Sequence, residues 1–249
     1  MDENYIKHAK LTELRELASR LELKGVSSLS KEKLAERVIN ELKDFEKFKK
    51  KEESKYRRIR QLGDEGKEGT TYLVIDNETN RRYAMKQFRA SKSIDKMIRE
   101  AELQQIGYEN GISPGVVDVN NHYRYIVMEK MDKSLFEVLR ENKGDLSDDY
   151  QEQLIKIFRK LDEIKIFHAD PNPSNFMIRG RKLFVIDYGF AKKIDRRLIT
   201  KHGIDNLNMH FMVLGFLLKI KEICGKVALY KYKKLVKYLT EQQRQLFKK

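Results

Sequence analysis

Apolar positions between residues 11 and 43 follow the period of an α-helix. One group recurs at three- and four-residue steps and consists of Leu11, Leu14, Leu17, Ala18 and Leu21. A second group consists of Leu34, Val38, Ile39 and Leu42. Between them, Gly25 suits the end of one helix and Ser30 the start of the next. The pattern predicts a helical module over residues 1–45, then a charged linker or helical extension over 46–55.

The pattern changes at Tyr56, where short runs rich in β-forming residues alternate with turns. Strands are predicted at 57–60, 71–76, 82–88 and 123–128. One helix at 93–108 falls among them, and further helices follow at 134–142, 148–164, 204–223 and 227–247. Strands first and then mostly helices is the order of a two-lobed α+β fold. We place the β-rich lobe at residues 56–130 and the helical lobe at 131–249.

The chain has 249 residues, enough for a large core, and a single cysteine, Cys224. One cysteine excludes an intramolecular disulfide framework and favours a reducing compartment. The longest apolar stretch, residues 211–218, is too short to span a bilayer, and the first residues lack the apolar run of a secretory signal. We therefore expect a soluble intracellular protein, of the cytoplasm or nucleus, that does not bind membranes.

The formal net charge of +14 is concentrated toward the C-terminus. Residues 1–53 have a net charge of +1, residues 54–218 have +5 and residues 219–249 have +8. From Lys226 to Lys249, lysines alternate with aromatic and apolar residues, which suits an acidic partner, including nucleic acid. The alternative is that this run is the last helix of the helical lobe, with a solvated basic face.

Two short segments in the second half of the chain form its most specific pattern. The first has the form H-x-D-x-x-x-x-N and contains His168, Asp170 and Asn175. A short apolar run then leads to Asp187 within the sequence D-Y-G. The ordered pair is far more specific than either segment alone. His168 is more typical of a packed, hydrogen-bonded core histidine than of a catalytic group.

Parts of a phosphate site precede these two segments. Gly63, Gly66 and Gly69 form a turn between predicted strands, where backbone amides can approach a triphosphate closely. Alone, this G-x-x-G-x-x-G run is more typical of a plain β-turn. Seventeen residues after Gly69, the predicted strand Y-A-M-K ends at Lys86, a compact charge on a long stem that suits a phosphate partner.

Together these segments resemble the protein-kinase superfamily, and the form His-Ala-Asp is most similar to RIO and other compact atypical kinases, including those of large DNA viruses. The resemblance implies ATP and Mg²⁺. It makes Asp170 the catalytic base, Asn175 and Asp187 metal ligands, and Lys86 the contact of the α- and β-phosphates. A virus-encoded protein, in the virion or the host cell, is among the expectations that follow.

The resemblance also requires a carboxylate partner for Lys86 on the next helix. Glu102 lies nearer the apolar stripe of that helix, but the local sequence E-A-E-L-Q is similar to small kinases that use the first glutamate, so we expect Glu100. The connector between the lobes would bind adenine through its backbone, and its residues would be Met128, Glu129 and Met131. A buried strand that runs into a loop is the alternative for that segment.

Several residues depart from the usual kinase pattern. Ala169 replaces the arginine that would pair with a phosphorylated activation loop, and Asn172 replaces a lysine near the γ-phosphate. Tyr188 replaces phenylalanine and adds a hydroxyl group. No A-P-E segment follows, so the usual peptide-docking platform is missing. We expect Asp205 to be the aspartate that opens the large buried helix of the helical lobe.

Residues 11–42 resemble a SAP domain, a small helix–turn–helix module associated with DNA. The match includes L-T-E-L-R-E-L in the first helix, L-K-G at the turn and L-A-E-R-V in the second helix. Basic side chains would contact DNA phosphates, and the candidates are Arg15, Lys24, Lys31 and Lys33. The low net charge opposes strong binding by this module alone, and a helical cap that docks a protein is the alternative.

The leading hypothesis is an ATP- and Mg²⁺-dependent kinase that phosphorylates Ser or Thr of a protein, with an N-terminal module that targets DNA. The alternative is a pseudokinase or nucleic-acid-bound scaffold that binds nucleotide without catalysis. Retention of Lys86, Asp170, Asn175 and Asp187 favours the enzyme. The irregular glycine run and the missing docking segment favour the alternative.

Overall fold

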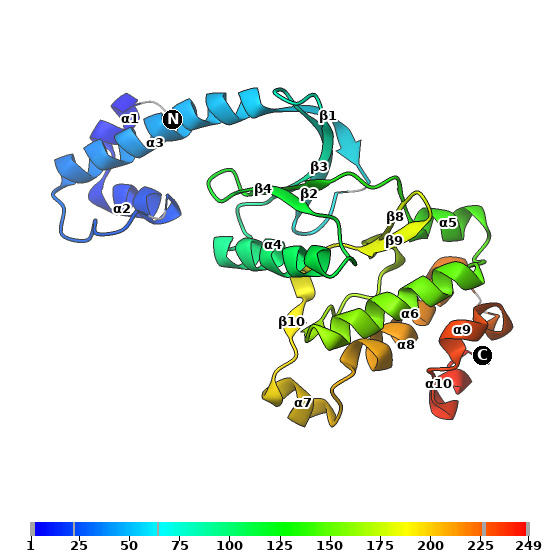
Figure 1. Cartoon of the computed structure of the whole chain (residues 1–249). Helices are drawn as coiled ribbons and strands as arrows, with labels where there is room; N and C mark the ends of the chain where they lie inside the picture. Colours follow the sequence, from blue (N-terminus) through cyan, green and yellow to red (C-terminus); the bar gives the residue numbers. More distant parts are fainter. Residues whose placement is uncertain (1–2, 22, 64, 226–227, 248–249) are drawn as a thin grey trace. The chain divides into compact units, whose positions relative to one another are not determined.

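The computed structural model describes residues 3–21, 23–63, 65–225 and 228–247 of the chain (Figure 1). It contains two compact units. The first comprises Met1–Arg57 with Ile75–Arg81, and the second comprises Arg58–Val74 with Arg82–Lys249. The predicted linker at 46–55 is helical.

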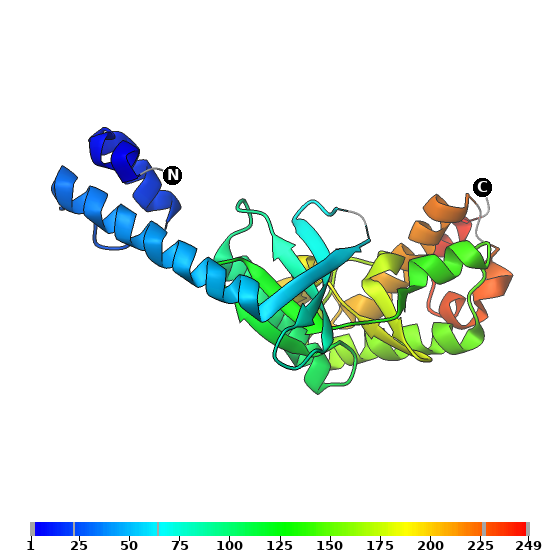
Figure 2. The ribbon, with the colours of Figure 1, turned by 90° about the horizontal axis from the view of Figure 1, so that it is seen from above.

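The first unit is built on three helices, α1 (Glu3–His8), α2 (Leu11–Arg20) and α3 (Lys31–Lys55). Helices α1 and α2 pack on α3, which is one uninterrupted helix (Figure 2). Their apolar core contains Ile6, Ala9, Leu14, Ala18, Leu34, Ala35, Val38 and Ile39. Gly25 adopts a left-handed φ of +72°, which explains a glycine between the two predicted helices. The sequence pattern did not predict α1, because six residues are too few to establish a helical period.

A five-stranded sheet forms the β-rich lobe, with strand order β1-β2-β3-β5-β4. The strands are β1 (Tyr56–Leu62), β2 (Gly69–Asp76), β3 (Arg82–Phe88), β4 (Val116–Asn120) and β5 (Tyr125–Glu129). Strand β3 pairs antiparallel with β5, and this register places Lys86 opposite Ile126. Helix α4 (Ile94–Glu109) begins after Ser93, whose hydroxyl accepts a hydrogen bond from the Lys96 N–H. A small apolar core of Ala84, Phe88, Met97, Ala101, Ile126 and Met128 joins α4 to the sheet.

The helical lobe is centred on two buried helices, α6 (Asp148–Glu163) and α8 (Val213–Cys224). The remaining helices are α5 (Leu135–Glu141), α7 (Arg196–His202), α9 (Lys233–Val236) and α10 (Glu241–Gln245). Short strands lie beside them: β6 (Lys133–Ser134), β7 (Ile166–Phe167), β8 (Phe176–Arg179), β9 (Lys182–Val185) and β10 (Lys192–Lys193). Strands first and then mostly helices is the predicted two-lobed α+β architecture, which is confirmed.

Three aromatic rings tie the catalytic-loop region to the helices of this lobe. Phe176 makes edge-to-face contacts with Phe158 of α6 and Phe216 of α8, with ring centroids 5.7 Å and 5.6 Å apart. All three side chains are fully buried. Aromatic pairs in this geometry stabilise a core beyond their buried area. Because Phe176 directly follows Asn175, the core fixes the end of the predicted catalytic loop.

The prediction of one continuous helix at 227–247 is wrong, because the segment is interrupted. The described part of this segment contains a 3₁₀ turn (Leu229–Tyr232) and the two short helices α9 and α10. The hydroxyl of Thr240 accepts a hydrogen bond from the Gln243 N–H and so caps a new helix. Lys226, Lys248 and Lys249, which belong to the predicted basic run, lie outside the described residues.

A buried polar network anchors the segment that precedes Asp170. The Asn208 amide donates to Asp162 Oδ1 and to the Ile166 carbonyl, both at 2.7 Å, and its oxygen accepts from the His168 N–H at 3.0 Å. Asp162 also accepts the backbone N–H groups of Asn208 and Met209. Burial raises the pKa of Asp162 despite these donors.

Asn208 takes the place that the sequence analysis gave to Asp205, and that expectation is wrong. The Asp205 side chain is 67% exposed and forms an ion pair with Lys165 at 3.6 Å. Asn208, in contrast, is fully buried in the π-helical turn Asn208–Met212 that leads into α8. An amide can both donate to Asp162 and accept from His168, whereas an ionised carboxylate can only accept.

Within the described residues, no helix combines the length and apolar content needed to cross a bilayer.

We expect Asn208→Ala to lower the free energy of unfolding by about 3 kcal/mol, because it leaves the buried Asp162 carboxylate short of donors. Urea denaturation followed by circular dichroism measures this change. Asn206→Ala is the matched control, since Asn206 is exposed two residues earlier, and it should change stability by less than about 0.5 kcal/mol. Equal effects of the two substitutions would contradict an anchoring role for Asn208.

Candidate active site

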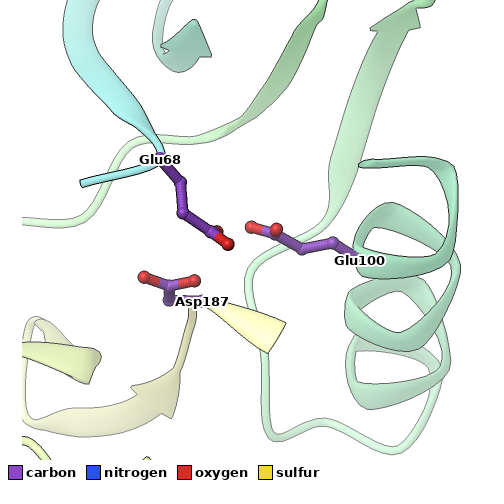
Figure 3. A group of neighbouring side chains, drawn as sticks. All are labelled: Glu68, Glu100 and Asp187. Carbon is purple, nitrogen blue, oxygen red and sulfur yellow. The ribbon is translucent and has the colours of Figure 1, made fainter. Parts of the chain in front are cut away.

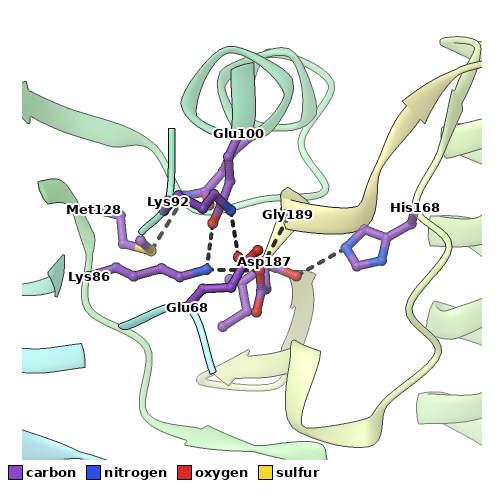
Figure 4. Close-up of polar contacts among 10 residues, drawn as sticks. Glu68, Lys86, Lys92, Glu100, Met128, His168, Asp187 and Gly189 are labelled. Atoms are coloured by element: carbon purple, nitrogen blue, oxygen red, sulfur yellow. Dashed lines mark hydrogen bonds and ion pairs between the residues drawn. The ribbon is translucent and has the colours of Figure 1, made fainter. Parts of the chain in front are cut away.

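A buried lysine joins three separate segments of the second unit. Lys86 on β3 donates from Nζ to Glu100 Oε1 on α4 at 2.6 Å and to Asp187 Oδ1 at 2.8 Å (Figure 4). The Glu100 side chain is only 3% exposed, so its charge requires a partner inside the protein. Glu102 is exposed, and Glu100 is therefore the carboxylate that contacts Lys86.

The electrostatics of this group favour the charged forms of Lys86 and Asp187. Burial alone would lower the pKa of Lys86, but the charges of Glu100 and Asp187, with their hydrogen bonds, outweigh it and raise that pKa. Burial would likewise raise the pKa of Asp187, but Lys86 and the Gly189 N–H lower it. A permanently ionised carboxylate and ammonium beside each other suit a site that receives phosphate and a cation.

A second lysine, which the sequence analysis missed, completes the network. Lys92 is 5% exposed and contacts Glu100 Oε2 at 2.9 Å and Glu68 Oε2 at 2.5 Å. Glu68 lies in the glycine-rich turn, so this ion pair fixes the turn against α4. The Glu68, Glu100 and Asp187 side chains point toward one another (Figure 3), with one oxygen of each within 4.8 Å of the others. No spacing rule would have identified Lys92 or Glu68, because their partners are distant in the sequence.

The glycines of the turn have different structural roles. Gly63 has a left-handed φ of +67°, and the Gly66 N–H donates to the Gly69 carbonyl. A Cβ atom at Gly69 would lie 2.1 Å from the Gln87 carbonyl oxygen on β3. Close packing of β2 on β3 is therefore sufficient to require glycine at position 69. The Glu68 carboxylate, rather than a glycine, is the part of this turn that lies closest to Asp187 and Lys92.

The predicted catalytic loop is held in place by its backbone. Ala169 adopts a left-handed φ of +65°, and Asp170 Oδ1 accepts the Asn172 N–H at 3.2 Å. The Asn175 carbonyl accepts the Ile186 N–H at 2.9 Å, which holds Asn175 beside the residue that precedes Asp187. Asn175 is buried, and its Nδ2 has no acceptor among the described residues. A carboxylate and an amide oxygen are ligand types that Mg²⁺ prefers, so Asn175 and Asp187 fit that ion chemically.

His168 is placed as a structural residue. Its ring is fully buried, and Nε2 lies 3.0 Å from the Ile186 carbonyl oxygen (Figure 4). Burial lowers the pKa of His168, so the ring is neutral at physiological pH. A neutral ring that bonds to the backbone beside Asp187 positions that aspartate rather than exchanging protons with solvent.

Tyr188 is tethered by the hydroxyl group that distinguishes it from phenylalanine. Its oxygen lies 2.6 Å from Ser113 Oγ, and both residues are buried. Burial raises the pKa of Tyr188, so the hydroxyl group stays protonated. A Cβ atom at Gly107 on α4 would lie 2.4 Å from both oxygens. A glycine on the helix therefore makes room for this hydrogen bond.

Of the predicted connector residues Met128, Glu129 and Met131, Met131 offers a free backbone donor. The Glu129 N–H donates to the Gly115 carbonyl at 3.0 Å, and the Glu129 carboxylate accepts the Gly115 N–H. The Glu129 N–H is therefore not available to a ligand. Met131 is buried, and no described residue accepts its N–H. Met128 lies buried behind the connector, with Sδ 3.5 Å from the Gln104 amide.

Comparisons with known proteins agree with this geometry. The protein kinase domain model matches residues 56–205, more than half of the chain. The chain is 25% identical over 150 residues to cyclin-dependent kinase F-3 of Oryza sativa subsp. japonica, which covers 56% of this chain and 34% of that protein. It is 27% identical over 141 residues to the KEOPS complex subunit Bud32 of Pyrococcus abyssi, and this match covers 53% of this chain and 60% of that protein. It is 28% identical over 154 residues to mitogen-activated protein kinase 2 of Arabidopsis thaliana, and this match covers 56% of this chain and 41% of that protein. The chain thus spans less than two thirds of each relative.

We expect Glu68→Gln to strengthen ATP binding about fivefold, because a carboxylate beside the phosphate site repels phosphate, and a unit charge about 4 Å away contributes about 1 kcal/mol in water. Lys92 keeps Glu100 as its partner in this variant. Calorimetric titration with ATP, with and without Mg²⁺, measures the effect.

Glu65→Gln is the control, since Glu65 lies in the same turn but is exposed and pairs with Arg89. It should leave the affinity for ATP within about twofold, because exposed ion pairs contribute little. Unchanged affinity of Glu68→Gln would show that Glu68 does not compete with the phosphates. A loss of affinity only in the presence of Mg²⁺ would instead identify Glu68 as a metal ligand.

Proposed function

This chain belongs to the protein kinase family, and we propose that it transfers the γ-phosphate of ATP to Ser or Thr of a protein, in a reaction that depends on Mg²⁺. The observation that supports this most directly is the contact of Lys86 with both Glu100 and Asp187. It joins the sheet, the helix and the aspartate segment at one point. Residues 56–130 would form the nucleotide-binding lobe and residues 131–249 the substrate-binding lobe.

Each residue has a separate task in this proposal. Lys86, oriented by Glu100, contacts the α- and β-phosphates, and the glycine turn covers them. The Met131 N–H would bind the adenine edge, with Glu129 beside it in the connector and Met128 at the deep end of the site. Asp170 accepts the proton of the attacking hydroxyl group and orients its oxygen toward the γ-phosphorus.

The metal ion would be held by Asn175 and Asp187. When bound, Mg²⁺ neutralises charge that develops on the phosphate oxygens. The chain supplies the rest of the stabilisation by placing Lys86 and the backbone donors in fixed positions before the reaction. The hydrogen bond between the Asn175 carbonyl and the Ile186 N–H supports this arrangement, because it keeps both ligands on adjoining segments.

We expect the wild-type chain to transfer label from radioactive ATP to generic acidic or basic proteins or to itself, and Asp170→Ala and Asp187→Ala to lower the rate at least about 100-fold. Asp149→Ala is the control, because Asp149 is an exposed aspartate on α6, and it should transfer label at the wild-type rate. Nucleotide binding by the wild type without any transfer would contradict the enzyme and favour the pseudokinase.

We further propose that the N-terminal helical unit contacts DNA. Arg15, Lys24 and Lys33 are exposed, and Lys31 is partly exposed. In the C-terminal run, Lys231 pairs with Asp145 and Lys234 with Glu152, which leaves less positive charge there for nucleic acid. The first unit is therefore the favoured DNA contact, although its overall charge is nearly balanced.

A salt titration of DNA binding by the full chain tests this proposal. Replacing Arg15, Lys24 and Lys33 together by glutamine should reduce the slope of log affinity against log salt by about 3, since each phosphate contact contributes about 0.9. Replacing Lys233 and Lys237 by glutamine tests the C-terminal run in the same way. A slope that the first set leaves unchanged would exclude this DNA surface.

A further inference from the structure

The segment after the D-Y-G sequence is strongly cationic. Between positions 192 and 201 it contains five exposed basic side chains: Lys192, Lys193, Arg196, Arg197 and Lys201. Its one carboxylate, Asp195, accepts the Leu198 N–H as the N-cap of α7. The charge of this segment is therefore not balanced from within.

Neighbouring carboxylates do not balance it either. None of the five basic groups has a hydrogen-bonding or ion-pair partner in the described part of the chain. Asp205 pairs with Lys165, and Asp162 is buried in the Asn208 network. Exposed lysines elsewhere commonly have partners, as Lys133 does with Glu141 and Lys219 with Glu222. Five adjacent cations without such partners repel one another, which is unfavourable unless an external anion binds them.

The fold joins this segment to the strand that leads into the loop of the predicted catalytic base. Strand β10 pairs antiparallel with β7, and the register sets Lys192 opposite Phe167. The Ile194 N–H also donates to the Lys165 carbonyl at 2.7 Å. Strand β7 ends directly before the loop that contains Asp170. Because the pairing is antiparallel, Lys192 is the cation nearest the loop, and the chain then runs away from it through Lys193 and into α7 (Figure 1).

We infer that residues 192–201 bind an acidic stretch of the protein substrate and thereby select acceptor sites that lie near Asp, Glu or phosphorylated residues. This inference rests on the proposed kinase function. The acceptor hydroxyl group must reach Asp170, and in this inference the flank of the peptide extends from there along β10 toward α7. Charge complementarity of this kind determines specificity and the rate of encounter more than absolute affinity.

A peptide fits this surface better than nucleic acid does. The cations lie on a two-residue strand and a seven-residue helix, a surface whose length matches a short peptide segment. The chain also lacks the A-P-E segment that would otherwise dock a peptide. A surface that binds the residues near the acceptor takes over the specificity role of that missing segment.

The test compares three peptides with one Ser acceptor in the same frame and with acidic, neutral or basic flanks. We expect the wild type to phosphorylate the acidic peptide with a kcat/KM at least about tenfold above that for the neutral one. Arg196→Gln/Arg197→Gln should reduce this ratio about fivefold through KM, as two exposed ion pairs allow. Raising the salt to 0.5 M should reduce the wild-type ratio as well.

Lys160→Gln/Lys219→Gln is the matched control, because it removes two exposed charges from other helices, and it should keep the wild-type ratio. Transfer of phosphate with no preference for the acidic peptide overturns the inference while the kinase function stands. Fluorescence anisotropy of a labelled acidic peptide measures binding separately from phosphate transfer. If the protein binds that peptide through Arg196 and Arg197 but transfers no phosphate, the surface stands and the proposed function fails. Displacement of the peptide by a much tighter-binding single-stranded oligonucleotide would assign the surface to nucleic acid and overturn the inference.

Discussion

The ion pairs of Lys86 are the interaction on which the rest of the site depends. Withdrawing an ammonium group from water is costly unless a carboxylate compensates for the lost hydration. Here Glu100 and Asp187 provide that compensation from two different segments, separated from Lys86 by 14 and 101 residues. The β-rich lobe and the aspartate segment must therefore fold together before Lys86 is stable in its largely buried position. Lys92 and Glu68 extend the same constraint to the glycine-rich turn.

The helical lobe depends on a network of a different kind. Asn208 and Asp162 hold the backbone before the catalytic loop through hydrogen bonds, with one buried carboxylate and no buried cation beside it among the described residues. Hydrogen bonds to a buried carboxylate fix direction as well as distance. The ring of Phe176 then packs the far end of the loop against α6 and α8. The loop with Asp170 is thus held at both ends, while Asp170 itself remains partly exposed.

The sequence predicted the parts of the site whose roles depend on local spacing. Asp170, Asn175 and Asp187 lie on short segments with a fixed form, and Lys86 lies near the end of a recognisable strand. Glu68, Lys92 and Asn208 could not be predicted in the same way, because their partners lie far along the chain and only the folded structure brings them together. Asp205 was predicted at this place because an aspartate was expected, whereas the network needs a group that both donates and accepts. The C-terminal run was predicted as one helix because its apolar spacing is helical, but Thr240 caps a new helix within it.

The hydrogen bond between Tyr188 and Ser113 has a consequence for inhibitor design. A compound that occupies the space of the Tyr188 ring has to expel a buried aromatic side chain and break this hydrogen bond. The broken bond leaves the buried Ser113 hydroxyl group without a partner, which is costly. A phenylalanine in the same place would lack the second penalty. Chemotypes that displace this ring should therefore favour other members of the family over this protein. Selective compounds should instead exploit the ion pair of Glu68 with Lys92, which also contacts the Glu100 carboxylate.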